Sequence, residues 1–168
     1  MGNKQYHKFV IYAVLGIALA AMVYWGLTQK NSAPALTMTT LSGETIELSQ
    51  LRGKTVLVNF WATSCPGCIK EMPHLVDVYQ RYHSKGLEIV AVSMSYDPAE
   101  HVRQFTAERR LPFPVVMDTH GDIARAFGEV KLTPTTFLID TDGNIAEQTI
   151  GDLDFVKLQQ RLDGVNKS

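Results

Sequence analysis

The first thirty residues of the chain differ from the rest in the pattern of their apolar positions. Residues 9–27, which begin at Phe9 and end at Leu27, are nineteen apolar or small residues without a charge or a proline. As a helix, such a run extends about 28 Å, which is close to the thickness of the hydrocarbon core of a bilayer. Tyr24 and Trp25 lie near its end, where an aromatic belt is expected. The pattern predicts a single N-terminal transmembrane helix that contacts the lipid bilayer through residues 9–27.

Charges on either side of this run predict its orientation. Lys4 and Lys8 precede it, and Lys30 is the only basic residue that follows before Arg52. By the positive-inside rule, we expect residues 1–8 in the cytoplasm, residues 28–35 as a linker and residues 36–168 as a domain outside the cytoplasm. A cleaved signal peptide is the alternative, because residues 33–35 (Ala-Pro-Ala) fit a cleavage site, but the apolar run is longer than usual for a signal peptide. Both interpretations export the domain.

Beyond residue 35, continuous apolar runs alternate with amphipathic stretches. The runs at residues 55–61 and 87–94 are rich in β-branched residues and are typical of strands buried on both faces. Turn residues at Ser42-Gly43 and Asp142-Gly143 predict two hairpins, one early and one late. Strands are predicted at residues 36–40, 45–48, 55–61, 87–94, 113–117, 135–140 and 145–150. Helices are predicted at residues 66–83, 98–109, 122–127 and 153–162. This order predicts an α/β domain, a mixed β-sheet flanked by helices with an N-terminal β-hairpin extension.

Composition and charge exclude some classes of function. The formal net charge is −1, and the 16 basic residues are not clustered, so nothing indicates nucleic-acid binding. The chain has two cysteines, Cys65 and Cys68, which is too few for a small secreted domain held together by disulfides. Both cysteines belong to a single Cys-Pro-Gly-Cys motif at residues 65–68.

The motif lies between a predicted buried strand and a predicted helix. Pro66 suits the first helical position, where its missing N–H costs nothing, so Cys65 should stand at the helix N-terminus. Free backbone N–H groups and the helix dipole favour a thiolate there, and the thiolate is the reactive form of cysteine. We expect Cys65 to attack a substrate disulfide and Cys68, one turn later, to resolve the mixed disulfide. This redox-active pair needs no bound cofactor.

Other uses of two cysteines fit less well. Haem attachment requires a histidine after the second cysteine, where this chain has Ile69. A zinc site requires four ligands, and no second cysteine pair exists, so no metal site is predicted. A purely structural disulfide would close a very small loop and stabilise little.

Two segments together resemble a known family. Residues 60–68 (Phe-Trp-Ala-Thr-Ser-Cys-Pro-Gly-Cys) are followed by Glu71 and Pro73, and residues 133–140 read Thr-Pro-Thr-Thr-Phe-Leu-Ile-Asp. This combination resembles the TlpA/ResA-like thioredoxins, which are membrane-tethered thiol-disulfide oxidoreductases of bacteria. The resemblance covers residues 36–162. It implies a thioredoxin-like fold on the periplasmic side of the bacterial cytoplasmic membrane.

The resemblance also implies roles for particular residues. It would make the Thr133-Pro134 bond cis and place that loop against the sulfurs, whereas base rates alone favour a trans proline. Substrate-binding residues would then be Thr133, Pro134, Trp61, Pro66 and Gly67. Glu71 matches a carboxylate that ResA-like members keep beside the cysteines. It lies three residues after Cys68, so a proton shuttle is one interpretation and a solvated helix glutamate the other. Asn59 stands where ordinary thioredoxins carry an aspartate.

Two departures from the family, and one difference from ordinary thioredoxin, affect the functional hypothesis. The residues between the cysteines are Pro66-Gly67, which differ from those of thioredoxin and of ResA, so the redox potential stays open. Residues 134–136 are Pro-Thr-Thr, whereas cytochrome-maturation members tend to have Pro-Glu-Thr. Tyr96, Asp97 and Pro98 begin a segment that is longer than thioredoxin needs.

The leading hypothesis is a reductase of disulfides in exported proteins, with apocytochrome c as one candidate substrate and a membrane protein as electron donor. A peroxiredoxin-type thiol peroxidase is an alternative, although the Pro-x-x-x-Thr-x-x-Cys frame is absent. A non-enzymatic Cu(I) chaperone that uses the same cysteine pair is a third hypothesis.

Overall fold

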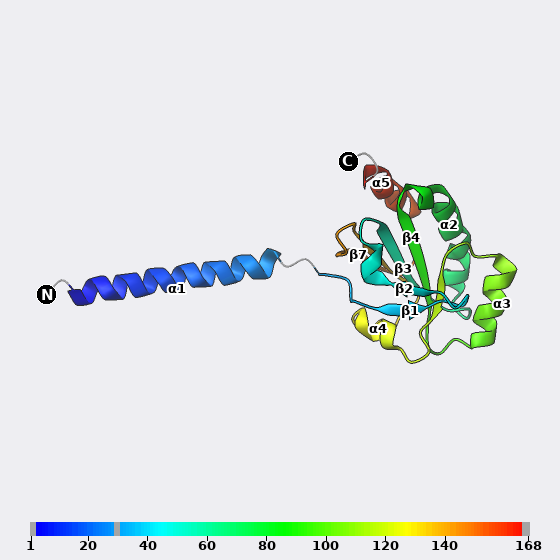
Figure 1. Cartoon of the computed structure of the whole chain (residues 1–168), viewed down its shortest axis with the longest axis horizontal. Helices are drawn as coiled ribbons and strands as arrows, with labels where there is room; N and C mark the ends of the chain where they lie inside the picture. The colour runs from blue at the N-terminus through cyan, green and yellow to red at the C-terminus, as the bar shows by residue number, and fades with distance from the viewer. Residues whose placement is uncertain (1–2, 29–30, 166–168) are drawn as a thin grey trace. The chain divides into compact units, whose positions relative to one another are not determined.

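The computed structural model describes residues 3–28 and 31–165, and it divides into two compact units, Met1–Asn31 and Ser32–Ser168 (Figure 1). In the first unit, helix α1 (Asn3–Thr28) is 26 residues long and contains the predicted anchor at residues 9–27. Among the described residues, no helix combines the length and the apolar character needed to cross a membrane. The predicted membrane-spanning helix is therefore not confirmed. Parts of the predicted N-terminal and linker segments, residues 1–2 and 29–30, and the last residues of the predicted domain, 166–168, lie outside the described residues.

The second unit is built on a five-stranded mixed sheet with the order β5-β4-β3-β6-β7. Strand β3 runs parallel to β4, β4 runs parallel to β5, and β6 runs antiparallel to both β3 and β7. The strands are β3 (Thr55–Trp61), β4 (Leu87–Ser93), β5 (Val115–Met117), β6 (Thr135–Ile139) and β7 (Ile145–Ile150). The mixed α/β sheet predicted from the order of elements is confirmed.

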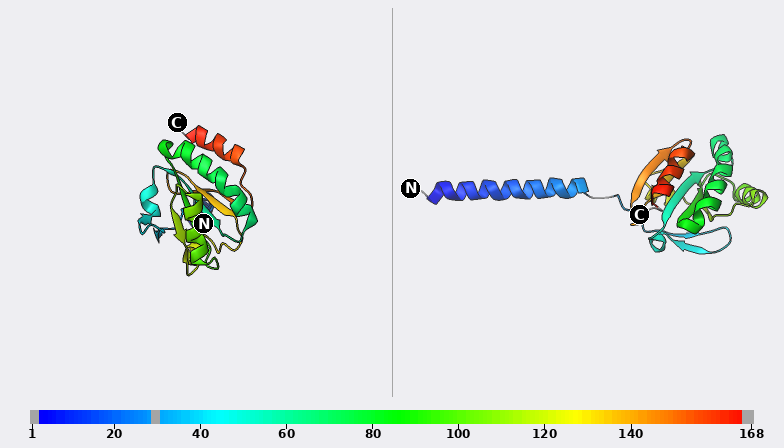
Figure 2. Two further views of the ribbon diagram at one scale, coloured as in Figure 1. Left: turned by 90° about the vertical axis from the view of Figure 1, so that its right-hand side faces the viewer. Right: turned by 90° about the horizontal axis from the view of Figure 1, so that it is seen from above.

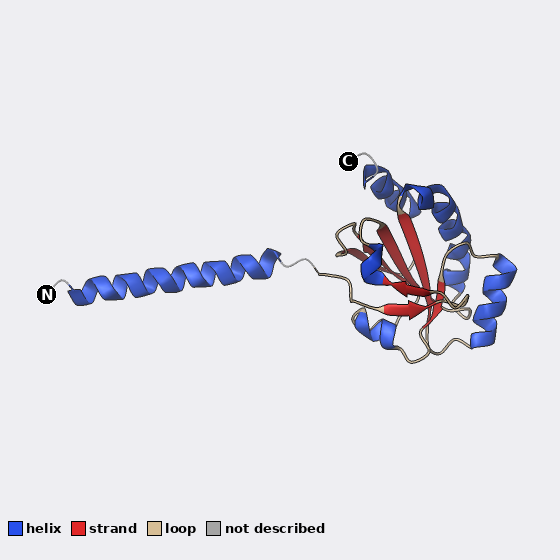
Figure 3. Cartoon of the chain, viewed as in Figure 1, coloured by secondary structure: helices blue, strands red, loops and turns tan. Residues whose placement is uncertain are grey.

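Helices cover the sheet on both sides, as Figure 3 shows. Successive residues of a strand point to opposite faces, so β3 serves two cores at once. Leu57 and Trp61 join a core with α2 (Pro66–Tyr82), α3 (Ala99–Arg109) and α5 (Phe155–Val165). Helices α2 and α5 lie side by side on this face (Figure 2).

The opposite face of the sheet is covered by shorter elements. Val58 and Phe60 of β3 point into a second core with Ile123 of α4 (Asp122–Ala126) and with Met38 and Leu48. Met38 belongs to β1 (Thr37–Thr39), which pairs antiparallel with β2 (Thr45–Glu47) as a separate two-stranded sheet, and the 3₁₀ helix η1 (Leu48–Leu51) follows. Both faces of the central sheet are thus buried, which accounts for the continuous apolar runs of β3 and β4.

Several element boundaries differ from the prediction for local reasons. The helix predicted at residues 66–83 ends at Tyr82 and continues as the 3₁₀ helix η2 (His83–Lys85), which Gly86 ends in the left-handed conformation at φ 92°. The helix predicted from residue 153 begins only at Phe155. The N–H of Leu153 points instead to a side chain of α2, and the Asp154 carboxylate accepts the N–H of Lys157 in the first turn.

Candidate active site

The two cysteines lie at the start of α2, shortly after the end of β3. Cys65 is the N-cap of α2, with an extended backbone (φ −97°, ψ 106°), and Pro66 follows in the first turn. Cys65 and Cys68 form a disulfide with their Cα atoms 5.3 Å apart. The main-chain N–H of Cys68 donates a 3.2 Å hydrogen bond to Cys65 Sγ. The same N–H would stabilise a thiolate at Cys65 once the disulfide is reduced.

The two sulfur-bearing residues differ in exposure. Cys65 is half-buried, whereas Cys68 is 2 % exposed and belongs to the core beneath the sheet. A polypeptide substrate can approach only an accessible sulfur. Of the two sulfur-bearing residues, Cys65 is therefore the one that a substrate can reach.

The loop before β6 lies against the cysteine motif. The peptide bond between Thr133 and Pro134 is cis. A Cβ placed on Gly67 would lie 3.6 Å from Pro134 Cδ, so the residue between the cysteines touches the cis-proline. The carbonyl of Pro134 accepts a 2.8 Å hydrogen bond from the N–H of Gly151, which ties the loop to the end of β7. The cis bond and the approach of this loop to the motif, both implied by the family resemblance, are confirmed.

Glu71 is a buried carboxyl group beside the motif. It is 5 % exposed, and its Oε1 accepts a 2.7 Å hydrogen bond from the N–H of Leu153. Its Oε2 is buried without a hydrogen-bond partner among the described residues. Burial raises the pKa of Glu71, the hydrogen bond from Leu153 opposes this, and the negative charge of Asp152 adds to the rise.

A small cavity connects this carboxyl group to the motif. It has a volume of about 170 Å³, and both Glu71 and Gly67 line it, together with Asp152 and His74. Glu71 is therefore not a solvated helix glutamate. Its position and raised pKa allow it to exchange a proton with groups at the motif.

The prediction that Trp61 binds substrate is wrong. Trp61 is fully buried, with 0 % exposure, and its ring packs 5.2 Å from that of Phe105 on α3. The alternation along β3 turns this side chain into the core, so it supports the site from below. Pro66 is exposed and Gly67 and Thr133 are half-buried, and these three residues, unlike Trp61, are open to a substrate.

Asn59 is also buried beneath the motif, at 1 % exposure. Its Nδ2 donates a 2.9 Å hydrogen bond to Thr136 Oγ1 of β6. An amide does not ionise in the pH range of interest, so Asn59 brings no titratable group to this position.

Two further residues at the site, Asp97 and Asp152, were not among the predicted site residues. Asp97, 4 % exposed, accepts a 2.7 Å hydrogen bond from the N–H of Thr63 and a 2.5 Å hydrogen bond from the Thr63 hydroxyl. It thereby holds the segment that leads into Cys65. Asp152 Oδ1 would lie 3.2 Å from a Cβ on Gly67. The only sequence signal for Asp97 was the extended segment that begins at Tyr96, and Asp152 had no signal because it is 84 positions from Cys68.

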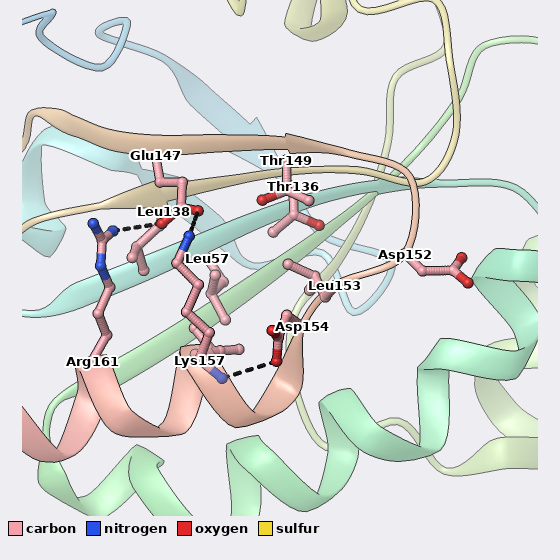
Figure 4. Close-up of a pocket in the computed structure, with 11 residues that line it drawn as sticks. Leu57, Thr136, Leu138, Glu147, Thr149, Asp152, Leu153, Asp154, Lys157 and Arg161 are labelled. Atoms are coloured by element: carbon pink, nitrogen blue, oxygen red, sulfur yellow. Dashed lines mark hydrogen bonds and ion pairs between the residues drawn. The ribbon is translucent and has the colours of Figure 1, made fainter.

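A larger cavity lies away from the sulfurs. It has a volume of about 240 Å³ and lies between β6, β7 and α5 (Figure 4). At its mouth Glu147 pairs with Lys157 Nζ at 2.7 Å and with Arg161 Nη1 at 2.8 Å. Neither cysteine lines this cavity, so it is not the reaction site. Among the described residues, no group of three or more His, Cys, Asp or Glu side chains is arranged to hold a metal ion.

The mixed sheet, the disulfide at a helix N-terminus and the cis-proline facing it define a class, the thioredoxin-fold proteins with a redox-active cysteine pair. The chain matches the family described as Redoxin over residues 28–160 and belongs to that family. It is 34% identical over 167 residues to "Thiol-disulfide oxidoreductase ResA" of Bacillus cereus, with 95% of each chain covered. It is 36% identical over 156 residues to the ResA of Halalkalibacterium halodurans, with 89% of this chain and 88% of the relative covered.

Solved structures agree with this assignment. The solution structure of a putative thioredoxin from Neisseria meningitidis has a TM-score of 0.76 and 37% identity, covering 83% of this chain and 93% of that chain. A putative thiol:disulfide interchange protein DsbE from Chlorobium tepidum has a TM-score of 0.74 and 29% identity, covering 82% and 97%. The protein is a thiol-disulfide oxidoreductase of the ResA/DsbE type with a thioredoxin-like fold and the cysteine pair Cys65 and Cys68.

Proposed function

We propose that this oxidoreductase reduces disulfides in exported proteins on the outer side of the bacterial cytoplasmic membrane. The observation that carries the proposal is the pairing of an accessible Cys65 with a buried Cys68 beside the carboxyl group of Glu71. In such a site a protein disulfide can reach the sulfur of Cys65, while the buried sulfur of Cys68 remains available to resolve the mixed disulfide. Apocytochrome c, whose cysteines must be reduced before haem attachment, is the candidate substrate that the resemblance to ResA-like proteins favours.

The reaction balances as a transfer of two electrons. The Cys65 thiolate attacks one sulfur of the substrate disulfide, and that disulfide breaks as the mixed disulfide forms. The other substrate sulfur leaves as a thiolate and takes up a proton. Cys68, after losing its proton, attacks Cys65 Sγ, releases the second substrate thiol and closes the Cys65–Cys68 disulfide. Glu71 is the group placed to accept the proton of Cys68.

The charges around the motif support the reducing direction. A strongly stabilised thiolate makes an enzyme of this kind oxidising. Pro66 and Gly67 bring no charged side chain between the cysteines, and the Asp152 carboxylate lies within contact distance of the position that a Gly67 side chain would occupy. Because a negative charge disfavours a nearby thiolate, the dithiol should be a better electron donor than one flanked by a cation.

Location and electron supply belong to the same proposal. The uncharged run at residues 9–27, with Lys4 and Lys8 before it, supports an N-terminal anchor with the catalytic unit on the periplasmic side. Disulfides persist in that compartment, so a reductase there needs electrons from the cytoplasm. A membrane protein with its own dithiol is the chemical class of donor that can reduce the Cys65–Cys68 disulfide.

Trapping tests the function. Cys68→Ala should accumulate mixed disulfides through Cys65 with exported proteins in intact cells, whereas Cys65→Ala should capture none. Capture by Cys65→Ala would reverse the assigned roles.

The redox potential tests the direction of electron transfer. A potential near that of thioredoxin, roughly −270 mV, is expected, and a value near that of DsbA, roughly −120 mV, would overturn the reducing direction. Peroxide consumption that needs Cys65 but not Cys68 would favour the peroxidase alternative, and tight Cu(I) binding without disulfide exchange would favour the chaperone.

Protease protection tests the location. In spheroplasts, added protease should digest the catalytic unit. Without protease, the protein should be recovered in the membrane fraction, and N-terminal sequencing should find no cleavage before residue 36. Protection of the catalytic unit, or its recovery in the soluble fraction, would contradict the proposed anchor.

A further inference from the structure

An apolar groove lies between α2 and α3, away from the cis-proline loop. In both views of Figure 2, α2 lies between α5 and α3, and the cavity that contains Glu71 is on the α5 side. The groove on the α3 side has a volume of about 220 Å³, and side chains of both helices line it. None of residues 133–135 is among them. The groove is therefore separate from the surface that faces Pro134 and from the cavity of the proton-accepting carboxyl group.

The groove begins next to the cysteine motif. The α2 residues that line it are spaced at i, i+3, i+4 and i+7, so they form one stripe along the helix, namely Ile69, Met72, Pro73 and Val76. Ile69 follows Cys68 directly, and both Ile69 and Val76 are only half-buried. Apolar surface thus extends from the edge of the active site along the outside of α2.

The two walls of the groove carry opposite charges that do not pair with each other. Arg109 of α3 places its guanidinium carbon 5.6 Å from the centroid of the Phe105 ring, which holds the cation over an apolar wall. Asp77 of α2 lines the groove as well. Neither Arg109 nor Asp77 makes an ion pair with another described residue. Both charges are therefore available to a partner.

The volume of the groove favours a side chain of a protein over a free small molecule. Sites for small molecules usually measure about 300–1,000 Å³, which is more than this groove offers. Protein interfaces depend on a few anchoring side chains that enter pockets, with less important contacts around them. The groove fits one such anchor that is apolar and is flanked by a carboxylate facing Arg109 and a cation facing Asp77.

We infer that this groove is the docking site of the protein that reduces the Cys65–Cys68 disulfide, and that it takes an apolar side chain flanked by one acidic and one basic residue. The inference rests on the proposed function, which requires a dithiol protein of the membrane as electron donor. The donor, unlike the substrate, must recognise the oxidised protein, and the groove is open in the form whose cysteines are joined. A donor docked here lies beside the motif and on the side away from α5.

The docked donor takes part in a balanced exchange of two electrons. A thiolate of the donor attacks Cys65 Sγ, the bond between Cys65 and Cys68 breaks, and Cys68 leaves as a thiolate and takes up a proton. The second donor thiol, after losing its proton, attacks the donor sulfur of the mixed disulfide and releases Cys65, so that the donor ends as a disulfide. The groove takes no part in the electron transfer and acts by holding the donor next to the sulfur.

The rate of re-reduction in cells tests the groove. Cells that contain the full-length protein receive a short pulse of diamide, and thiol alkylation then gives the half-time in which Cys65 and Cys68 return to the dithiol. Arg109→Glu and Val76→Ser should each lengthen this half-time about tenfold, because loss of an anchoring contact commonly costs about that factor. Arg109→Lys keeps the charge and should stay within about threefold of the wild-type protein.

Matched controls separate docking from structural damage. Arg103→Glu reverses another exposed charge of α3 that does not line the groove, and it should change the half-time less than about twofold. Reduction of each purified variant by dithiothreitol should also stay within about twofold of the wild-type rate. Equal slowing in cells and with dithiothreitol, or an equal effect of Arg103→Glu and Arg109→Glu, would overturn the groove as a docking site.

The remaining outcomes separate the groove from the function on which it rests. Unchanged half-times in both Arg109→Glu and Val76→Ser would overturn the groove while leaving the disulfide reductase intact. Slower exchange of the reduced variants with insulin, without a change in re-reduction, would assign the groove to the substrate and overturn the donor as its occupant. A wild-type cysteine pair that dithiothreitol reduces but cells do not would overturn both the donor and the reducing direction.

Discussion

The N–H of Leu153 donates a 2.7 Å hydrogen bond to Glu71 Oε1 across 82 positions of the chain. This contact joins the first turns of α2 to the segment before α5, and it holds the carboxyl group next to the cavity that reaches Gly67. The second oxygen, Oε2, is buried and has no partner among the described residues. Glu71 thus has one oxygen committed to the fold and one oxygen free for proton transfer.

Glu71→Gln should slow the resolution of mixed disulfides. Glutamine can still accept the hydrogen bond from Leu153 but cannot take a proton from Cys68, so we expect a decrease of roughly 10- to 100-fold in the resolving rate. Single-turnover quench experiments that follow the lifetime of the mixed disulfide measure this rate. Glu44→Gln, an exposed glutamate in the β1–β2 turn, is the matched control. An unchanged lifetime and pH profile in Glu71→Gln would remove Glu71 from the mechanism.

The same variant should change the pH dependence of stability. Burial raises the folded-state pKa of Glu71 above its ordinary value of 4.5, so the folded protein binds this proton more tightly than the unfolded chain does. The contribution of Glu71 to the free energy of unfolding is therefore fully present below about pH 4.5 and is lost as the pH rises through the raised pKa. The Tm of Glu71→Gln relative to the wild-type protein should increase over that range. A relative Tm that falls as the pH rises would contradict the burial argument.

Reduced Cys65 should ionise at a lower pH than a free cysteine. It caps α2, and the N–H of Cys68 points at its sulfur, so the helix N-terminus favours the thiolate. Thiolate absorbance near 240 nm in the Cys68→Ala variant, titrated against pH, measures this ionisation. Asp152→Asn should lower the midpoint further, because it removes a negative charge beside Gly67. A rise in the midpoint on Asp152→Asn would contradict the proposed influence of Asp152 on the potential.

Asp97→Asn should destabilise the protein and slow the attack on substrate. The buried carboxylate accepts two hydrogen bonds from Thr63, and an amide at this place satisfies them less well, so we expect a loss of about 1–3 kcal/mol in the free energy of unfolding. Urea denaturation measures the loss. Thr63→Val removes the hydroxyl alone and should cost less, because the N–H bond remains. Equal losses in the two variants would show that the hydroxyl bond carries the whole effect.

Glu147→Gln should have a small effect that disappears in salt and in acid. The hydrogen bond from Lys157 lowers the pKa of Glu147, burial partly opposes this, and the charges of Arg161 and Lys157 add to the lowering. The resulting stabilisation is present above the ordinary value of 4.5 and is lost as the pH falls through the lowered pKa. Since both cations are largely exposed, the loss should stay below about 1 kcal/mol near neutral pH. In about 1 M salt, the difference in Tm between Glu147→Gln and the wild-type protein should disappear. A difference that persists in salt would indicate an effect of packing instead.

The elements that the sequence predicted best are those with strong local patterns. The run of β3 and the Pro66 start of α2 are visible in neighbouring residues, and together they placed Cys65 at a helix N-terminus. Boundaries were less accurate where a distant group decided them. The last helix begins at Phe155, two residues later than predicted. Asp154 caps its first turn, and the N–H of Leu153 bonds to Glu71, a contact that no residue near position 153 indicates.

The sequence alone determined the chemistry of this protein, because a thiolate at the first turn of a helix depends on the residues of that turn and on the strand before it. Tertiary structure decided what surrounds the sulfurs. Trp61 turned into the core, Asp152 came beside Gly67, and Tyr96 reached Thr133, since such contacts depend on how the sheet brings together segments that are far apart along the chain.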